Sequence, residues 1–169
     1  MKNKSNFDHK DLIKKISWTW MVIWLFILGI CYYIIINITY RTNTDPQVCN
    51  GKKCFTVELA RTQAEQEKGL MNRTSMGENS GMIFIFPQSN MYNFRMKNTR
   101  IPLDMLRIDD TYKVVRILTA QPCIADPCAL YRPETFAKYV LEINAGIAAK
   151  YKIHEWSMMK FRNISSPTK

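Results

Sequence analysis

The sequence predicts an α+β protein in which one transmembrane helix near the N-terminus precedes a compact, β-rich domain. Three observations lead to this prediction. Residues 16–38 contain no charged side chain. The later part of the chain consists of short segments in which apolar and polar residues alternate, as they do in half-buried strands. Helix signals there are few and short, which favours a partly closed antiparallel sheet or a barrel with short helices.

The uncharged run is long enough to cross a membrane. Its roughly 23 residues would span about 34 Å as a helix, against a hydrocarbon core of about 30 Å. Lipid offers the backbone no hydrogen-bond partners, so such a span is helical. Trp18 and Trp20 at its start and Tyr40 at its end suit the two membrane interfaces. We therefore predict a single anchor that holds the protein to the membrane through Ile16 to Tyr40.

Charge before the run predicts its orientation. Residues 1–15 carry five lysines against two aspartates, which places the N-terminus in the cytoplasm. The anchor then lies in the inner (cytoplasmic) membrane, and the main domain is extracytoplasmic or periplasmic. A cleaved signal peptide is one alternative, but the apolar run is too long and no small-x-small site follows it. Lipidation of Cys31 is another, but Ile30 stands where a small residue is required.

The length of 169 residues allows one domain plus an appendage. We divide the chain into a cytoplasmic basic segment (1–15), the anchor (16–40), a polar stem (41–47), the extracytoplasmic domain (48–164) and a tail (165–169). The formal charge of +10 is spread along the chain after the N-terminus, and no nucleic-acid motif accompanies it. This favours a basic, solvated surface near a membrane and no nucleic-acid partner.

Turn and cap signals divide the domain into short elements. Thr62 to Glu65 matches a capping box, and Gly69 supplies a stop, so a helix of about two turns lies between them. Residues 81–86 are apolar on both faces and end at Pro87, which predicts a central strand buried on both sides. The other predicted elements are strands at 55–59 and 92–97, a hairpin of 105–108 with 112–118 around Asp109-Asp110, a strand at 138–143, a helix at 145–153 that Asn144 caps, and a last strand at 157–164.

Residues 96–104 join a predicted strand to a rigid corner. Pro102 fixes its own φ, and the side chains of Asn98 and Thr99 cap turns by bonding nearby backbone. We expect the corner to present Lys97 on one side and Asp104 on the other. Such a corner suits a bound ligand, but two strands that simply meet would look the same.

Charged residues on the predicted strands extend this candidate site. By alternation, Glu58, Arg95, Lys97 and Glu142 fall on polar strand faces. They either hold an anionic or sugar-like ligand, or do acid–base work, or form cross-strand ion pairs worth under about 1 kcal/mol each. No catalytic residue is assigned. The candidate ligand-binding residues are Glu58, Arg95, Lys97, Asn98, Thr99, Asp104 and Glu142.

Four cysteines form two pairs with the same spacing. Cys49 and Cys54, like Cys123 and Cys128, are separated by four residues. Outside the cytoplasm such pairs are usually oxidised, and four cysteines allow three connectivities. We predict local pairing, worth about 2 kcal/mol for each short loop. A four-thiolate zinc site is a weaker alternative, and a redox dithiol is weaker still because its cysteines are normally two residues apart.

Metal and cofactor chemistry has little support in the sequence. Thioethers select Cu(I), so the methionines suggest copper handling. Alternation nevertheless places Met82 and Met96 on core faces, where methionine is a common filler. His9 and His154 are the only histidines, and they lie on opposite sides of the predicted membrane. We therefore expect neither a cofactor nor a bound metal.

The order of several short motifs resembles one family, the bacterial and archaeal domain of unknown function 192, whose members are often exported or membrane-attached. The match runs roughly over residues 57–153. This resemblance implies a compact, β-rich α+β domain and no established activity. The family usually has an aromatic residue, commonly Trp, where this chain has Arg95, which keeps a flat surface but adds charge. The motifs are Val57-Glu58-Leu59-Ala60, Glu67-Lys68-Gly69-Leu70-Met71-Asn72-Arg73, Gly81-Met82-Ile83-Phe84, Met96-Lys97-Asn98-Thr99, Ile101-Pro102-Leu103-Asp104, Ala120-x-Pro122-Cys123, Cys128, Tyr131, and Leu141-Glu142-x-x-Ala145-Gly146.

These observations favour a membrane-anchored binding or accessory module that works with an envelope protein partner or a small ligand. An enzyme that uses the corner of Lys97 and Asp104 is the first alternative. It requires those groups to converge within hydrogen-bond reach in a cleft. Metal handling through methionine and cysteine is the second alternative.

Overall fold

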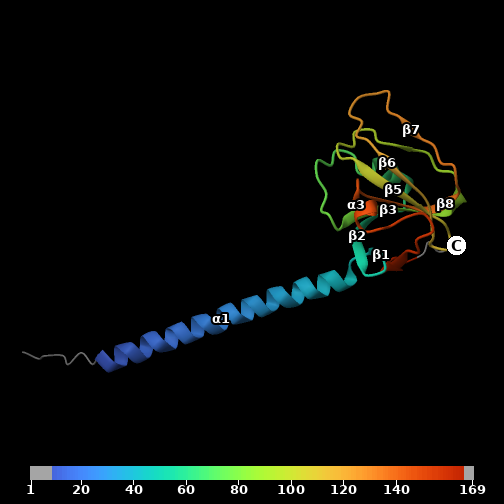
Figure 1. Cartoon of the computed structure of the whole chain (residues 1–169). Helices are drawn as coiled ribbons and strands as arrows, with labels where there is room; N and C mark the ends of the chain where they lie inside the picture. The colour runs from blue at the N-terminus through green and yellow to red at the C-terminus, as the bar shows by residue number, and fades with distance from the viewer. Residues whose placement is uncertain (1–8, 166–169) are drawn as a thin grey trace, which may run out of the picture. The chain divides into compact units, whose positions relative to one another are not determined.

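A computed structural model describes residues 9–165 of the chain, with side chains for residues 18–40 and 44–165. The chain divides into two compact units between Thr44 and Asp45 (Figure 1). The first carries the predicted anchor, and the second carries all the strands. The predicted basic segment 1–15 and tail 165–169 fall largely outside this description. Residues 1–8 and 166–169 are not described, and residues 9–15 are described without side chains.

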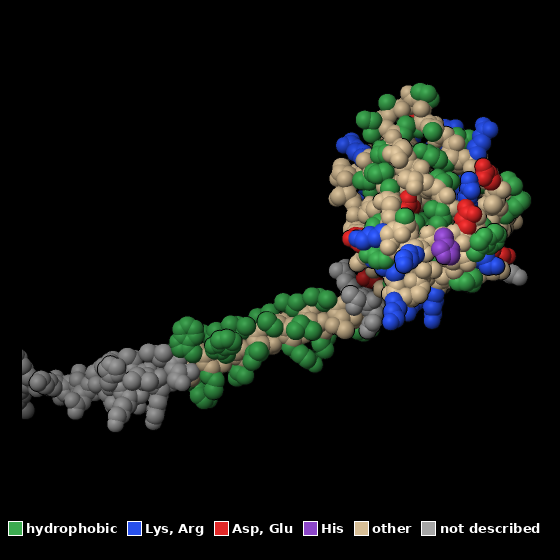
Figure 2. All heavy atoms as spheres, viewed as in Figure 1, with side chains coloured by type: hydrophobic (Ala, Val, Ile, Leu, Met, Phe, Trp, Pro, Cys, Tyr) green, Lys and Arg blue, Asp and Glu red, His purple; other side chains and the backbone are tan. Residues whose placement is uncertain are grey.

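The described part of the first unit is one helix, α1 (His9–Thr44). Within it, Trp18–Tyr40 is long and apolar enough to cross a membrane, and none of this span is buried against other parts of the protein. Figure 2 shows apolar side chains on all visible sides of it. The helix extends beyond the predicted anchor into the polar stem, and it stops at Thr44 because Pro46 disfavours helical geometry at the residue before it.

The second unit is built on a seven-stranded, curled half-barrel sheet with the strand order β6-β5-β8-β3-β2-β1-β9, so the predicted fold class is confirmed. A two-stranded sheet joins β4 to β7. The strands are β1 (Gln47–Asn50), β2 (Lys53–Ala60), β3 (Ser80–Asn90), β4 (Phe94–Arg95), β5 (Leu103–Ile108), β6 (Val114–Ala120), β7 (Leu130–Tyr131), β8 (Ala137–Asn144) and β9 (Lys160–Arg162).

One parallel pair distinguishes this sheet from the predicted antiparallel one. β2 and β3 run parallel, whereas the other strand pairs of the sheet are antiparallel. A parallel pair needs a crossover connection, and α2 (Gln63–Lys68) lies in it. The predicted capping box is confirmed, because the Thr62 hydroxyl accepts from the Glu65 N–H while the Glu65 carboxylate accepts from the Thr62 N–H.

Both faces of the central strands are buried, which gives the domain two apolar layers. On one face, which we call the α3 face, Leu106 and Leu141 pack with Ile147 and Ala148 of α3 (Ile147–Lys150). On the other, which we call the α2 face, Met105 and the aromatic rings of β3 pack with Leu70, which follows α2. Met82 and Met96 lie in this second layer, as alternation predicted.

Three predicted elements differ in extent. The strand predicted at 92–97 is ordered as a strand only at Phe94–Arg95, which pairs with β7. β3 continues past Pro87 to Asn90, with a register irregularity after Ile85 that accommodates a residue without an N–H. The last strand is confined to Lys160–Arg162.

The cap predicted for the last helix is wrong. The N-cap of α3 is Gly146, which has a left-handed φ of 83°. No side chain forms a capping hydrogen bond there. The Asn144 amide instead donates to the carbonyl oxygens of Met76 and Gly77, at 2.9 and 3.2 Å. Asn144 therefore ties β8 to the loop before β3.

The half-buried pattern predicted for residues 138–143 is also wrong in this part of the sheet. β8 lies between β3 and β5, and its residues from Tyr139 to Ile143 are all buried. Glu142, which alternation placed on a polar face, is 4% exposed. A central strand covered on both faces has no solvated side.

Candidate functional site

The α2 face holds a pocket of about 550 Å³. This volume lies within the usual range for small-molecule sites. α2 and the segment after it line one side, and β3, β4 and β8 line the others. The lining residues are Gln63, Gln66, Glu67, Lys68, Gly69, Leu70, Met71, Phe84, Phe86, Tyr92, Asn93, Phe94, Arg95, Met96, Lys97, Thr99, Leu130 and Glu142.

Glu142 is the buried acid of this pocket. Its side chain points to the α2 face, opposite Met82 on β3 and Met105 on β5. No group among the described residues hydrogen-bonds or ion-pairs with its carboxyl. Burial alone raises the pKa of Glu142 to about 8. The carboxyl is therefore mostly protonated at neutral pH and has an O–H to donate.

Two glycines allow close approaches of the backbone, one between β3 and β8 and one at the pocket wall. A Cβ on Gly81 would come within 2.6 Å of the Glu142 carbonyl oxygen, so only glycine lets β3 approach β8 here. Gly69 ends α2 with a φ of 45°, and a Cβ there would lie 3.3 Å from the Phe84 ring. Gly69 thus allows both the left-handed turn and the close contact with the pocket wall.

Aromatic side chains form the pocket wall by packing on each other. The rings of Phe86 and Tyr92 are stacked, with centroids 3.5 Å apart. Phe84 meets Phe94 edge to face at 5.1 Å. These contacts fix the rings of β3 against the segment around β4. The result is a rigid apolar wall with flat surfaces.

A buried arginine lies behind that wall. The Arg107 guanidinium is 5.5 Å from the Phe94 ring centroid, and its Nη1 donates to the Tyr92 carbonyl oxygen at 3.0 Å. Its Nε and Nη2 atoms have no hydrogen-bond partner among the described residues. Burial lowers the pKa of Arg107, but an arginine keeps its charge at neutral pH. The wall is therefore backed by a positive charge.

Three cations lie around the mouth of the pocket. Lys68, Arg95 and Lys97 all line it and are exposed. The Lys97 ammonium lies 2.8 Å from the Asp126 carboxylate, and this hydrogen bond lowers the pKa of Asp126. Lys68 and Arg95 form no ion pair with the described residues. Glu67 is the exposed acid beside them.

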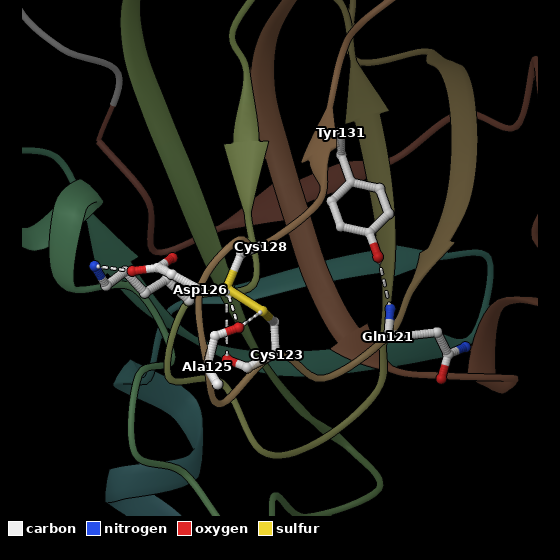
Figure 3. Close-up of a disulfide and its surroundings, with 7 residues drawn as sticks. Gln121, Cys123, Ala125, Asp126, Cys128 and Tyr131 are labelled. Atoms are coloured by element: carbon white, nitrogen blue, oxygen red, sulfur yellow. Dashed lines mark hydrogen bonds and ion pairs between the residues drawn. A yellow bond between two sulfur atoms is a disulfide. The ribbon is translucent and has the colours of Figure 1, made fainter.

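A disulfide-closed loop supports this mouth (Figure 3). Cys123 and Cys128 are bonded to each other, and the Cys123 N–H donates to the Thr99 carbonyl oxygen at 3.2 Å. Tyr131 accepts a hydrogen bond from the Gln121 N–H at 2.9 Å. The second disulfide joins Cys49 to Cys54 across the β1–β2 pair. Both bonds are the locally paired ones that we predicted.

The structure divides the predicted ligand-binding residues into two groups. Arg95, Lys97, Thr99 and Glu142 line the pocket, whereas Glu58, Asn98 and Asp104 are not among its lining residues. The exposed Glu58 forms a two-oxygen ion pair with Arg73, at 2.5 and 2.6 Å. Asn98 shapes the turn itself, with a φ of 55°.

Asp104 and Lys97 do not flank one ligand. Asp104 is 3% exposed and lies on the α3 face, where its carboxylate accepts from the Ala148 N–H at 3.0 Å and from the Thr119 hydroxyl at 2.8 Å. Successive strand residues point to opposite faces, and Asp104 precedes Met105, which faces α2. The convergence of Lys97 and Asp104 that an enzyme at this corner would require is therefore not seen.

Residues that sequence reasoning did not single out complete the pocket. They include the aromatic wall, Leu70 and the supporting Arg107. Arg107 could have been noticed in the sequence, because it is the charged residue in the otherwise apolar second half of the strand 103–108. In the described part of the chain, no group of three or more His, Cys, Asp or Glu side chains is placed to hold a metal ion.

Comparison with known proteins gives a consistent family assignment. A crystal structure of a protein of unknown function from Novosphingobium aromaticivorans is 36% identical, with a TM-score of 0.60 over 69% of this chain and 83% of that one. A Sinorhizobium meliloti protein provisionally described as a transcription regulator is 28% identical, with a TM-score of 0.61 over 70% of this chain and 93% of that one. No curated protein matches the chain.

The family model of domain of unknown function 192 (DUF192), described as "Uncharacterized ACR", matches residues 46–161. This range begins just after α1 and contains every strand from β1 to β8. The resemblance predicted from the short motifs is thus confirmed, and the chain belongs to the DUF192 family.

Proposed function

We propose that this protein is a membrane-anchored, extracytoplasmic module that binds a small ligand in the pocket of the α2 face. One observation carries the proposal. Glu142 is 4% exposed as a residue, its carboxyl has no hydrogen-bond partner among the described residues, and it lines a pocket of about 550 Å³. Buried polar groups are nearly always hydrogen-bonded, so a buried group left without a partner in a pocket suits a bound molecule.

The binding role is favoured over the enzymatic one by the separation of the candidate acid–base groups. Lys97 is engaged by Asp126, and the Asp104 carboxylate accepts two hydrogen bonds on the α3 face. Glu142 is the titratable residue whose burial suits acid–base work, but no hydrogen bond or ion pair joins it to another titratable residue of the pocket lining.

The membrane location is supported by two features. Trp18–Tyr40 has the length and composition of a membrane span. Two disulfides in the other unit are typical of domains outside the reducing cytoplasm. We propose a single pass through the inner membrane with a cytoplasmic N-terminus. This arrangement places the β-rich domain outside the cytoplasm, so we do not carry over the regulatory role provisionally given to the Sinorhizobium meliloti protein.

The topology is tested by fusing reporters after Lys169. We expect a reporter that is active only outside the cytoplasm to work and one that is active only in the cytoplasm to fail. The opposite pattern would refute the orientation and remove the argument from the disulfides. Fractionation of the membranes tests the inner-membrane assignment separately.

The binding role is tested by ligand-observed NMR. The full chain in detergent is screened against a library of small aromatic and aliphatic molecules that includes anions, cations and neutral compounds. Leu130→Trp fills the pocket, whereas Ile124→Trp adds the same ring at a residue that is 75% exposed and does not line it. We expect hits that Leu130→Trp abolishes and Ile124→Trp leaves unchanged. Absence of any such hit would refute the binding role.

A further inference from the structure

The inner end and the mouth of the pocket differ in chemistry, and this difference indicates what kind of molecule fits. We propose that the ligand is a small amphipathic anion with a flat apolar body, whose inner end carries an oxygen that accepts a hydrogen bond from the Glu142 carboxyl. This inference rests on the proposed function, because it assumes that a small molecule occupies the pocket. It assigns a separate role to each of the three parts of the pocket.

The inner end calls for an acceptor. Met96 and Phe84, each 2% exposed, line the same buried region as Glu142. An ionised carboxylate without a partner is costly in such surroundings, so the group stays neutral there. A neutral carboxyl has one O–H to donate, and no acceptor among the described residues receives it. A carbonyl, ether or hydroxyl oxygen of the ligand supplies that acceptor.

The walls call for a flat apolar body. Phe86 and Tyr92 present a stacked pair of rings, and Phe84 and Phe94 present an edge-to-face pair. Because these rings are held by each other, they form fixed surfaces that a planar group can contact without first ordering them.

The mouth calls for a negative charge. Lys68 and Arg95 line it without an ion-pair partner among the described residues. Two exposed acids oppose them: Glu67, and Asp126, whose pKa is lowered mainly by the hydrogen bond from Lys97 and also by the charge of Arg95. Residues 1–15 supply +3 of the formal charge of +10, and the remaining +7 follows the anchor, where it adds a long-range attraction for anions. The planar guanidinium of Arg95 suits a carboxylate or a phosphate, which it can bind with two hydrogen bonds.

A cationic ligand is disfavoured even though aromatic rings and a carboxyl line the pocket. The Arg107 guanidinium already lies 5.5 Å from the Phe94 ring centroid. A second cation against these rings would be repelled by Arg107 and by the cations at the mouth. Cation binding would also require Glu142 to lose its proton within a buried site.

Three probes of nearly identical shape test both ends of the ligand. They are 4-acetylbenzoate, which has the anion and the acceptor, 4-isopropenylbenzoate, which replaces the acceptor oxygen by a CH₂ group, and 4-acetylbenzamidinium, which replaces the anion by a cation. Their affinities for the full chain in detergent are measured by ligand-observed NMR titration, with detergent alone and Leu130→Trp as blanks. We expect 4-acetylbenzoate to bind at least about tenfold more tightly than the other two, a margin that one hydrogen bond or one ion pair supplies.

Substitutions assign each preference to its residues. Glu142→Leu should erase the preference for acetyl over isopropenyl, whereas Glu142→Gln, which keeps an N–H donor, should retain it. Replacing both Lys68 and Arg95 by Gln should erase the preference for carboxylate over amidinium. Because burial raises the pKa of Glu142 to about 8, binding of 4-acetylbenzoate should weaken above that pH in the natural protein and not in Glu142→Gln.

Tightest binding of the amidinium, equal binding of the two benzoates, or no binding by any of the three would overturn the inference. Failure of the broader proposal looks different. If other library compounds bind and Leu130→Trp abolishes their binding, the pocket is a binding site and only the ligand class is wrong. If the library gives no hit that depends on the pocket, the proposed function itself fails.

Discussion

Two buried carboxyl groups lie on opposite faces of the same sheet, and they differ in how they are satisfied. Asp104 on the α3 face accepts two hydrogen bonds, one of them from the backbone at the start of α3. Glu142 on the α2 face is equally buried but has no partner among the described residues. One face is closed by its own hydrogen bonds, whereas the other leaves a polar group facing a pocket.

The two carboxyl groups therefore have different roles, one in stability and one in ligand binding. A buried acid that is fully bonded holds elements together, and its loss destabilises the fold. A buried acid without a partner costs stability, and a protein that keeps one accepts that cost at a site where a ligand can supply the missing bond. The two faces therefore make opposite predictions for similar substitutions.

The largest expected effect is the pH dependence that Glu142 imposes. Its pKa is raised from 4.5 to about 8 in the folded chain, so the folded state holds one more proton than the unfolded state between these values. The stability from this group is fully present below about pH 4.5 and is lost as the pH rises through 8. The loss is on the order of 5 kcal/mol. Glu142→Gln should remove it, as urea denaturation of the full chain in detergent at pH 5, 7 and 9, followed by near-ultraviolet circular dichroism, will show.

The exposed Asp110→Asn serves as the control for this titration and should keep the pH dependence of the natural protein. If Glu142→Gln retains that dependence, Glu142 is not the group that titrates, and the contrast between the two faces fails.

The next effect concerns Asp104. Asp104→Ala leaves the buried Ala148 N–H without its acceptor, and we expect the free energy of unfolding to fall by about 3 kcal/mol. Asp104→Asn keeps an acceptor oxygen and should cost less. Hydrogen exchange should rise first in α3. If Glu142→Gln lowers the free energy of unfolding at pH 7 as much as Asp104→Ala does, the distinction between the two acids is lost.

The two disulfides provide a smaller, regional comparison. Replacing either pair by serine should cost about 2 kcal/mol through the entropy of the opened loop. Loss of Cys123–Cys128 should speed hydrogen exchange at the Cys123 amide beside the pocket, whereas loss of Cys49–Cys54 should act on β1 and β2. If both double variants relax the same amides, the regions are not independent.

The smallest effect is expected at the exposed pair of Glu58 and Arg73. Glu58→Gln should change stability by under about 1 kcal/mol, and less at high salt, because water and ions screen exposed ion pairs. Binding of 4-acetylbenzoate should remain unchanged, because Glu58 does not line the pocket. A clear loss of binding would return Glu58 to the ligand site that the sequence predicted.

Local signals in the sequence were enough for the elements whose chemistry is local. The uncharged run, the capping box at Thr62 and the hairpin around Asp109 are each contained in a few neighbouring residues. The two disulfides close loops of the same short spacing. The corner at 96–104 is likewise a true turn, with the Thr99 N–H bonded to the Met96 carbonyl oxygen at 3.0 Å.

The candidate site depended on contacts between distant parts of the chain. The alternating pattern predicts that Glu142 and Leu141 face opposite sides of their strand. It does not predict that other parts of the domain cover both sides. Placing β8 between β3 and β5 buried Glu142, and the crossover through α2 built the pocket over it. The sequence by itself determined the long apolar helix, the capping box, the hairpin and the family, because their signals are local. Only the tertiary structure decided which acid is bonded and which is left open, since burial and partnership arise from strand order and packing.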